Sequence, residues 1–263
     1  SPSSTAIAIA AFSAASPPKI WSVDPLVKVF PDSQPADENS FPARAEVARG
    51  EHATFQIVVR ADRPMVDLRV KVTEFRPATG QGESLKPQPA RFVGYVPVDR
   101  PTQAPPKVQL RKIPSEFPDP LLELPSIDVP ANRTQPIWIT VATPPAAEPG
   151  LYAATLNLTC RNGDEPFTSG VQLKLSIVPV TVTHTRLWVT NWWSNTLRPG
   201  KPANMEDPAW WKELRANARM MADRRQNVAL ISALDLCRYG AGASGELTFD
   251  WTMFDRTVQV FVD

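Results

Sequence analysis

Three stretches decide the fold of this chain: RLWVTNWWSN (residues 186–195), DPAWWKELRANARMMADRRQ (residues 207–226) and NVALIS (residues 227–232). An apolar run, an amphipathic segment and a second apolar run follow one another, which predicts strand, helix and strand. Strands that alternate with helices form parallel sheets. The sequence before Val182 differs, because it is strand-like throughout and holds 26 of the 29 prolines. We therefore expect a multidomain chain in which an all-β domain precedes an α/β domain.

The first domain is predicted from apolar residues that recur with a period of two. In VDLRVKV, residues 66–72, every second side chain is apolar, which is typical of a strand with one buried and one wet face. The same pattern occurs in ATFQIVVR (53–60), PIWITVAT (136–143), YAATLNLTC (152–160) and VQLKLSIV (171–178). About seven such strands predict an antiparallel, immunoglobulin-like β-sandwich over residues 20–182.

Residues 100–136 interrupt this pattern. They carry nine prolines and few periodic apolar residues. Long loops of this kind are uncommon unless they serve a function. We expect an extended excursion that packs on the following domain.

The second domain, residues 183–263, is predicted to begin a (β/α)₈ barrel. Strands are expected at residues 187–190 and 228–231, the latter covered on both faces. Asp207 as N-cap and Pro208 in the first turn predict a helix, and a second helix is expected near Thr252 with Asp255 completing a capping box. The buried stripes predicted for the two helices are Trp211, Leu214, Ala218, Met221 and Ala222, and Phe254, Val258, Phe261 and Val262.

The length of this second domain indicates that the barrel is incomplete. A closed barrel needs about 250 residues, whereas residues 183–263 number 81. About two strand–helix units therefore fit, and we expect the chain to be truncated or a fragment of a larger protein.

Composition excludes several classes of function. The chain has 28 basic and 27 acidic residues, a net charge of +1, so neither nucleic acid nor an anionic membrane is expected as a partner. Two cysteines, Cys160 and Cys237, cannot form a disulfide framework. His52 and His184 have no partner at metal-ligand spacing, so no metal and no cofactor is predicted.

The N-terminal residues suggest export. Residues 5–15, TAIAIAAFSAA, resemble the apolar part of a secretory signal peptide, within a tail spanning residues 1–19. This run is too short for a transmembrane helix. We expect a secreted or periplasmic bacterial protein.

Candidate substrate-binding residues follow from the barrel prediction, because barrel active sites lie at the carboxyl ends of the strands. Trp192 and Trp193 can offer a flat apolar face to a sugar ring, with Asn191 bonding to hydroxyls. Alternatively, one tryptophan packs into the core, since adjacent strand residues point to opposite sides. Asp235 and Arg238 can bind a hydroxyl or acetamido group, or form a local ion pair with each other.

The chain resembles a known family at several phrases. These are WSVDPLVKVFPD (21–32), RGEHATFQIVVRA (49–61), EPGLYAATLNL (148–158), VQLKLSIVPV (171–180), RLWVTNWW (186–193) and DWTMFDRTVQVF (250–261). Together they resemble family 123 of the glycoside hydrolases from about residue 20 to residue 263. The resemblance implies exo-acting β-N-acetylgalactosaminidase activity with retention, assisted by the 2-acetamido group of the substrate. It also implies an adjacent pair, in which Asp orients the acetamido group and Glu is the general acid/base.

No catalytic residue is assigned within the chain. The Asp37-Glu38 and Asp164-Glu165 dipeptides lie in a polar loop and in a hairpin turn, where carboxylates are usually solvated. The family's pair belongs at the end of a mid-barrel strand, which we expect beyond residue 263. The chain is thus predicted to be the N-terminal part of a glycosidase, inactive alone, with a glycan as substrate and the rest of the barrel as partner. The alternative is a non-catalytic β-sandwich module that binds carbohydrate or docks to another domain.

Overall fold

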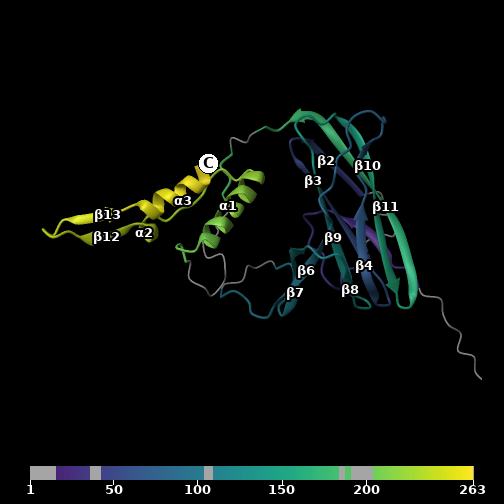
Figure 1. Cartoon of the computed structure of the whole chain (residues 1–263). Coiled ribbons are helices and arrows are strands. Elements are labelled where there is room, and N and C mark those ends of the chain that lie inside the picture. The colour runs from purple at the N-terminus through teal and green to yellow at the C-terminus, as the bar shows by residue number, and fades with distance from the viewer. Residues whose placement is uncertain (1–15, 36–42, 104–108, 184–186, 191–203, 263) are drawn as a thin grey trace, which may run out of the picture. The chain divides into compact units, whose positions relative to one another are not determined.

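The computed structural model describes residues 16–35, 43–103, 109–183, 187–190 and 204–262. The signal-like residues 5–15 therefore lie outside the described part. The chain divides into two compact units, residues 1–183 and residues 184–263 (Figure 1).

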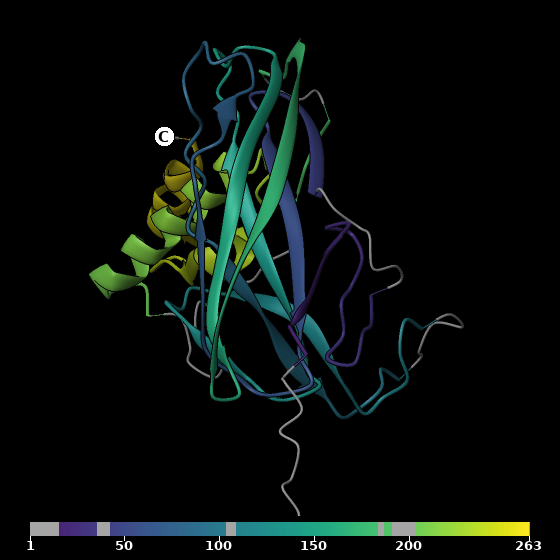
Figure 2. The same cartoon turned by 90° about the vertical axis from the view of Figure 1, so that its right-hand side faces the viewer.

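The first unit consists of two β-sheets. The five-stranded sheet has the order β1 (Lys19–Val23), β3 (His52–Arg60), β9 (Thr134–Ala142), β6 (Arg91–Val98) and β7 (Ser115–Leu122). The other sheet has the order β2 (Ala43–Arg49), β11 (Glu165–Thr181), β10 (Gly150–Asn162), β4 (Met65–Val72) and β8 (Ile127–Val129), with β5 (Arg76–Pro77) pairing β10. Figures 1 and 2 show the long β10–β11 hairpin running the length of this unit. Pairing between the named strands is antiparallel, except that β2 runs parallel to β11.

One hydrophobic core joins the two sheets into a sandwich. Ile57 and Ile139 from the five-stranded sheet and Leu156 and Leu173 from the other are completely buried in the same cluster. Along β10 the buried and exposed residues alternate, as the period of two predicts. Strand β9 is buried on both faces along most of its length. The strands predicted from alternating apolar residues are therefore confirmed.

The outer face of the five-stranded sheet is partly covered by the chain that follows β1. Trp21, Val29 and Val58 form a second, smaller cluster there. The Gln56 side chain donates from Nε2 to the carbonyl oxygens of Asp24 and Val27, each at 3.1 Å. These bonds fasten the loop to the middle of strand β3.

The prediction of an extended excursion over residues 100–136 is wrong for much of that stretch. Strand β7 pairs with β6, and β8 pairs with β4. Proline cannot donate to a ladder and is therefore confined to sheet edges. Strand β7 carries Pro118 and Pro120 and lies at the edge of its sheet. Prolines that suggested a loop thus mark an edge strand.

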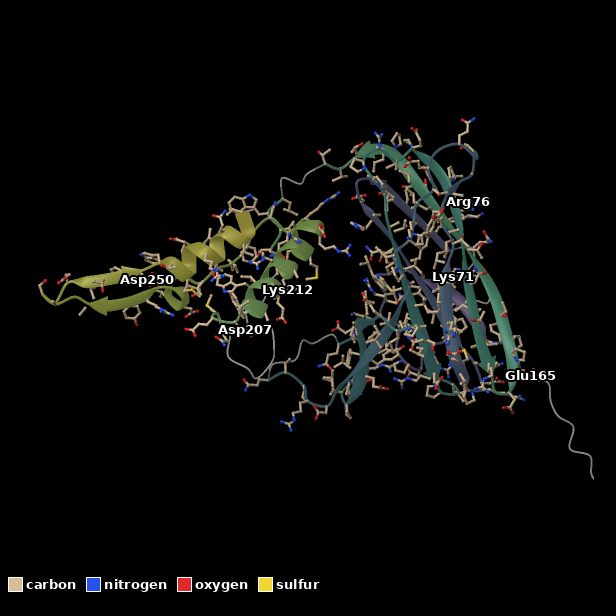
Figure 3. The ribbon with its side chains drawn as sticks, in the orientation of Figure 1. Lys71, Arg76, Glu165, Asp207, Lys212 and Asp250 are labelled. Atoms are coloured by element: carbon tan, nitrogen blue, oxygen red, sulfur yellow. The ribbon has the colours of Figure 1, made fainter. Side chains whose placement is uncertain are left out.

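The second unit contains α1 (Pro208–Asp223), α2 (Ala233–Leu236), β12 (Arg238–Ala241), β13 (Leu247–Asp250) and α3 (Thr252–Val262). The predicted start of α1 is confirmed, because Asp207 Oδ1 accepts from the backbone N–H of Ala209 at 2.8 Å. The start of α3 is right, but its capping differs from the prediction. Asp250, at the end of β13 (Figure 3), accepts from the backbone N–H of Thr252 at 3.0 Å in place of a Thr252–Asp255 capping box.

Neither strand predicted for this unit is present. Residues 187–190 and 228–231 form no strand, although the two segments lie side by side. The N–H groups of Asn227 and Val228 both donate to the carbonyl of Val189, at 3.1 and 3.2 Å. Asn227 adds side-chain bonds to Val189 N–H and to the Leu187 carbonyl. Because both backbone bonds end on one carbonyl, no ladder develops.

Where the sequence predicted the exit from a strand, the chain forms a short helix and a hairpin. Tyr239 faces Phe249 across β12 and β13, and every residue of both strands is exposed. The hairpin turns at Gly245, whose φ of 85° lies in the left-handed region that favours glycine.

Helices α1 and α3 pack through a small core. Trp210, Trp211 and Leu214 are buried there, and Met205, Met253, Val260 and Phe261 pack against them. The stripe predicted for α1 is right at Trp211 and Leu214, whereas Ala222 is exposed. Of the stripe predicted for α3, Phe254, Val258 and Phe261 are half-buried, whereas Val262 is 70% exposed and wrong; the fully buried residue of this helix is Thr257. Thr257 was missed because it is polar, but its hydroxyl donates to the Met253 carbonyl at 2.8 Å within the helix.

Candidate functional site

A cleft of about 550 Å³ lies within the second unit. It is formed by the segment before α1, by α1 itself, by α2 and the start of β12, and by α3. Its polar lining consists of Asn204, Glu206, Arg215, Asp235, Arg238 and Arg256, and its apolar lining of Met205, Pro208, Trp211, Leu236 and Met253. An apolar floor beneath converging polar groups is typical of a site for a small polar ligand.

Trp211 anchors the floor of the cleft. Its indole Nε1 donates to the Met205 carbonyl at 2.8 Å, and its ring meets the edge of Trp210 with centroids 4.6 Å apart. The guanidinium of Arg256 lies 3.8 Å from the centre of the Trp211 ring. This cation–π contact holds the Arg256 side chain of α3 against Trp211 of α1.

Asp235 and Arg238, both predicted to bind substrate, line this one cleft. Ser232 caps α2 by accepting from the N–H of Asp235 at 3.4 Å, which sets Asp235 in the first turn. Both side chains are exposed, and they form no ion pair with each other. The structure thus brings the two residues together without the local pairing that was the alternative. Their role in substrate binding stays a prediction.

Arg238 acts instead on a neighbour in the hairpin. It is the register partner of Asp250 across β12 and β13. Hydrogen bonds from Thr252 lower the pKa of the Asp250 carboxyl, and the positive charge of Arg238 adds a smaller effect in the same direction. Arg238 nevertheless forms no salt bridge with a carboxylate in the described part of the chain.

Three other candidate residues, Asn191, Trp192 and Trp193, lie outside the described residues, so their roles stay predictions. Conversely, sequence reasoning missed Arg215 and Arg256. A signal was present for Arg215, since it follows Trp211 by four residues and helical residues at that spacing share a face. No comparable signal points to Arg256, because its approach to Trp211 depends on how α3 packs against α1.

A second cleft, of about 480 Å³, lies on the sandwich near β7, and two of its three carboxylates, Asp32 and Glu116, are paired with arginines. Arg133 binds Glu116 through two bonds of 2.8 Å, and Arg111 binds Asp32 at 2.6 Å. The hydrogen bond from Arg133 lowers the pKa of Glu116, and that from Arg111 lowers the pKa of Asp32. Burial raises the pKa of Tyr95, whose hydroxyl donates to the Thr134 carbonyl at 2.8 Å. We therefore assign these groups a structural role, in which they stabilise the edge strand β7.

Two acidic dipeptides and two cysteines carry further reactive groups. Asp164 and Glu165 are exposed at the β10–β11 turn, and Glu165 lies at the end of the long hairpin (Figure 3). Asp37-Glu38 lies outside the described residues. Cys160 and Cys237 are both buried and free. Throughout the described ranges, no group of three or more His, Cys, Asp or Glu side chains is placed to hold a metal ion. No helix in the described part is both long and apolar enough to cross a membrane.

Comparison with known proteins gives a family match within the first unit. Residues 30–160 match the family model of the glycoside hydrolase 123 N-terminal domain. No curated protein matches the chain. Among solved structures, the chain is similar to a family 123 glycoside hydrolase from Clostridium perfringens, described for its hydrolysis of glycolipid glycans, with a TM-score of 0.69 and 13% identity. The match covers 94% of this chain and 45% of that enzyme.

Other solved structures give weaker matches. The CooA pilin subunit of enterotoxigenic Escherichia coli has a TM-score of 0.32 at 12% identity, covering 61% of this chain and 99% of the pilin. The sialic acid binding region of a Streptococcus sanguinis adhesin has a TM-score of 0.30 at 13% identity, covering 90% of this chain and 44% of the adhesin. The resemblance to family 123 is confirmed by the family model and by the fold, and the chain spans less than half of the C. perfringens enzyme.

Proposed function

We propose that these residues form the N-terminal part of a glycoside hydrolase that acts on β-linked N-acetylgalactosamine. The observation that carries the proposal is the match of residues 30–160 to the N-terminal domain of family 123. The fold similarity to a family 123 enzyme adds support, because it extends over 94% of the chain. A stand-alone carbohydrate-binding sandwich is not favoured, because the similarity continues past the sandwich.

In this proposal residues 184–263 begin a catalytic (β/α)₈ barrel. Support comes from the bonds of Asn227 and Val228 to Val189, which hold the two segments predicted as the first barrel strands side by side. Neighbouring parallel strands would occupy such positions in a complete sheet.

The proposed chemistry is hydrolysis with retention, assisted by the substrate. The 2-acetamido oxygen attacks the anomeric carbon while a glutamic acid protonates the leaving oxygen, and an adjacent aspartate orients the acetamido group. Water then opens the bicyclic intermediate with the glutamate as base. We propose that this Asp-Glu pair is supplied by residues outside the present sequence, in keeping with a chain that spans 45% of the C. perfringens enzyme.

The cleft of the second unit is the proposed place for contacts to the sugar. The Asp235 carboxylate can accept from a hydroxyl or from the acetamido N–H, and Arg238 can donate to a hydroxyl or carbonyl oxygen. Trp192, Trp193 and Asn191 are proposed to add stacking and a hydrogen bond. Each contact orients the substrate and performs no proton transfer.

The test uses the complete protein that carries these residues and, separately, the 263-residue chain. An aryl β-N-acetylgalactosaminide should release its chromophore with the complete protein only, and NMR should detect the β-anomer of the sugar first. A thiazoline derived from N-acetylgalactosamine, which mimics the bicyclic intermediate, should inhibit. Release of the α-anomer would refute retention, and activity of the 263-residue chain would refute the proposed location of the catalytic pair.

We also propose that the protein is exported, on the composition of residues 5–15 alone. The check is the N-terminal sequence of the protein recovered from the native bacterium. A protein that retains its full leader inside the cell would overturn this proposal.

A further inference from the structure

Three arginines from three different elements line the cleft of the second unit. Arg215 comes from α1, Arg238 from β12 and Arg256 from α3. None of them forms a salt bridge with any residue in the described part of the chain. This contrasts with Arg111 and Arg133 of the sandwich, whose guanidinium groups are held by carboxylates at 2.6 and 2.8 Å.

The cleft has a surplus of positive charge. Its lining carries three guanidinium groups and two carboxylates, Glu206 and Asp235, and the carboxylates lie beyond salt-bridge distance of the arginines. Three like charges around one cleft repel one another. An anion placed between them would remove that repulsion and use donors that no carboxylate occupies.

The chemistry of the three residues favours an oxyanion. A guanidinium group presents its N–H donors in a planar fork that matches a carboxylate or sulfate. Arg256 is already fixed over the Trp211 ring at 3.8 Å, so less side-chain freedom is lost when it binds a ligand. Arg238 is held in a hairpin strand whose register partner is Asp250. At least the Arg256 guanidinium is therefore positioned before a ligand arrives.

We propose that this cleft binds the carboxylate or sulfate group of an acidic glycan. The oxyanion would lie between Arg215, Arg238 and Arg256, and the sugar ring would lie against the half-buried side chains of Met205 and Met253. Asp235 would accept from a hydroxyl of the same ring. The glycan part of this inference rests on the proposed glycosidase function, and it deepens that function by assigning an acidic substrate class.

The first experiment is a calorimetric titration of the 263-residue chain at low salt. The probes are glucuronate, N-acetylgalactosamine 6-sulfate, neutral N-acetylgalactosamine and inorganic sulfate. One of the two acidic sugars should bind at least about tenfold more tightly than the neutral sugar, and added salt should weaken that binding by screening. The stronger of the two identifies the oxyanion as carboxylate or sulfate. Equal binding of acidic and neutral sugars, or inorganic sulfate binding as tightly as either acidic sugar, would overturn the proposal.

Substitutions of single arginines test whether the acidic sugar binds in this cleft. Arg238→Gln and Arg256→Gln should each weaken binding of the acidic sugar about tenfold, because each removes a charged donor. Arg219→Gln is the matched control, since Arg219 is an exposed arginine of α1 that does not line the cleft. Arg256→Lys keeps the positive charge but loses the planar fork, so it should also weaken binding. If both glutamine variants bind like Arg219→Gln, the anion site lies elsewhere and the proposal fails.

Failure of this inference can be told apart from failure of the proposed function. Release of N-acetylgalactosamine by the complete protein, with no preference of the cleft for acidic sugars, would leave the glycosidase and remove the anion site. Arginine-dependent binding of an acidic sugar without any hydrolysis by the complete protein would support the anion site and refute the proposed glycosidase. The thermal unfolding midpoint of each variant shows whether a loss of binding reflects a loss of fold.

Discussion

Replacing Trp211 with phenylalanine should destabilise the core between α1 and α3 more than the same change at its neighbour Trp210. Both indoles are buried, with exposed fractions of 1% and 7%, and both changes remove the same atoms. The two differ in the indole N–H. Trp211 Nε1 donates to the Met205 carbonyl at 2.8 Å, whereas Trp210 Nε1 is buried with no partner in the described part of the chain.

The expected difference is about 2 kcal/mol. Loss of the Trp211 hydrogen bond lowers the stability of this core by about 1 kcal/mol. Removal of an unpaired buried donor at Trp210 raises its stability by at least about 1 kcal/mol. The weaker cation–π contact of Arg256 with a phenyl ring acts in the same direction, by about 0.5 kcal/mol at most. Because 1.36 kcal/mol corresponds to a factor of ten, the opening equilibrium of this core should differ about thirtyfold between the two variants.

Hydrogen exchange followed by mass spectrometry can measure this difference locally. Peptides from α1 and α3 should exchange about thirtyfold faster in Trp211→Phe than in Trp210→Phe. Peptides from β9 in the sandwich serve as an internal reference and should be unchanged. If Trp210→Phe exchanges as fast as Trp211→Phe, the hydrogen bond to Met205 does not stabilise this core and the reasoning is refuted.

Three further outcomes follow from the sandwich. Gly94→Ala should lower stability by about 1–3 kcal/mol in thermal unfolding, because an added Cβ would lie 2.9 Å from Pro120; Gly170→Ala, where the nearest atom is at 3.4 Å, is the control and should change little. The bond from Arg133 lowers the pKa of Glu116 below 4.5, so its stabilising effect is complete above that pH and is lost as the pH falls through the lowered pKa. Glu116→Gln should therefore reduce the acid-induced fall in the unfolding temperature, and an unchanged fall would contradict this. Since burial raises the pKa of Cys160, an alkylating reagent at about pH 8 should label it only after unfolding; rapid labelling of the folded chain would count against that burial.

The strands of the sandwich could be predicted from the sequence where only one face of the strand is buried. Alternation in residues 152–160 and 171–178 reflects strands with one face on the core, and β10 and β11 follow it. The edge strand β7 could not be predicted in this way, because Pro118 and Pro120 remove the donors that a central strand needs. The two prolines are tolerated because β7 pairs only with β6 in its sheet, so the donors on its other side are not needed.

The second unit was harder to predict because local signals and tertiary contacts disagree. The cap at Asp207 is local and was correct. The buried face of α3 depends on its partner α1. A prediction from apolar residues alone therefore selected Val262 as buried, whereas the buried residue is Thr257. For the site, Asp235 and Arg238 could be located by their place after an apolar run. Arg256 could not, since only the packing of two helices brings it over Trp211.

The pairing of β2 with β11 has a consequence for the order in which the chain can fold. Strands β10 and β11 are joined by a two-residue turn and pair over 13 positions from Gly150↔Ile177 to Asn162↔Glu165, so they can zip together quickly. Strand β2 instead pairs in parallel with residues about 130 positions later, beginning at Ala43↔Leu173. On the ribosome β2 must therefore wait, with an open edge, until β11 has emerged. During this interval the unpaired edge of β2 is open to aggregation.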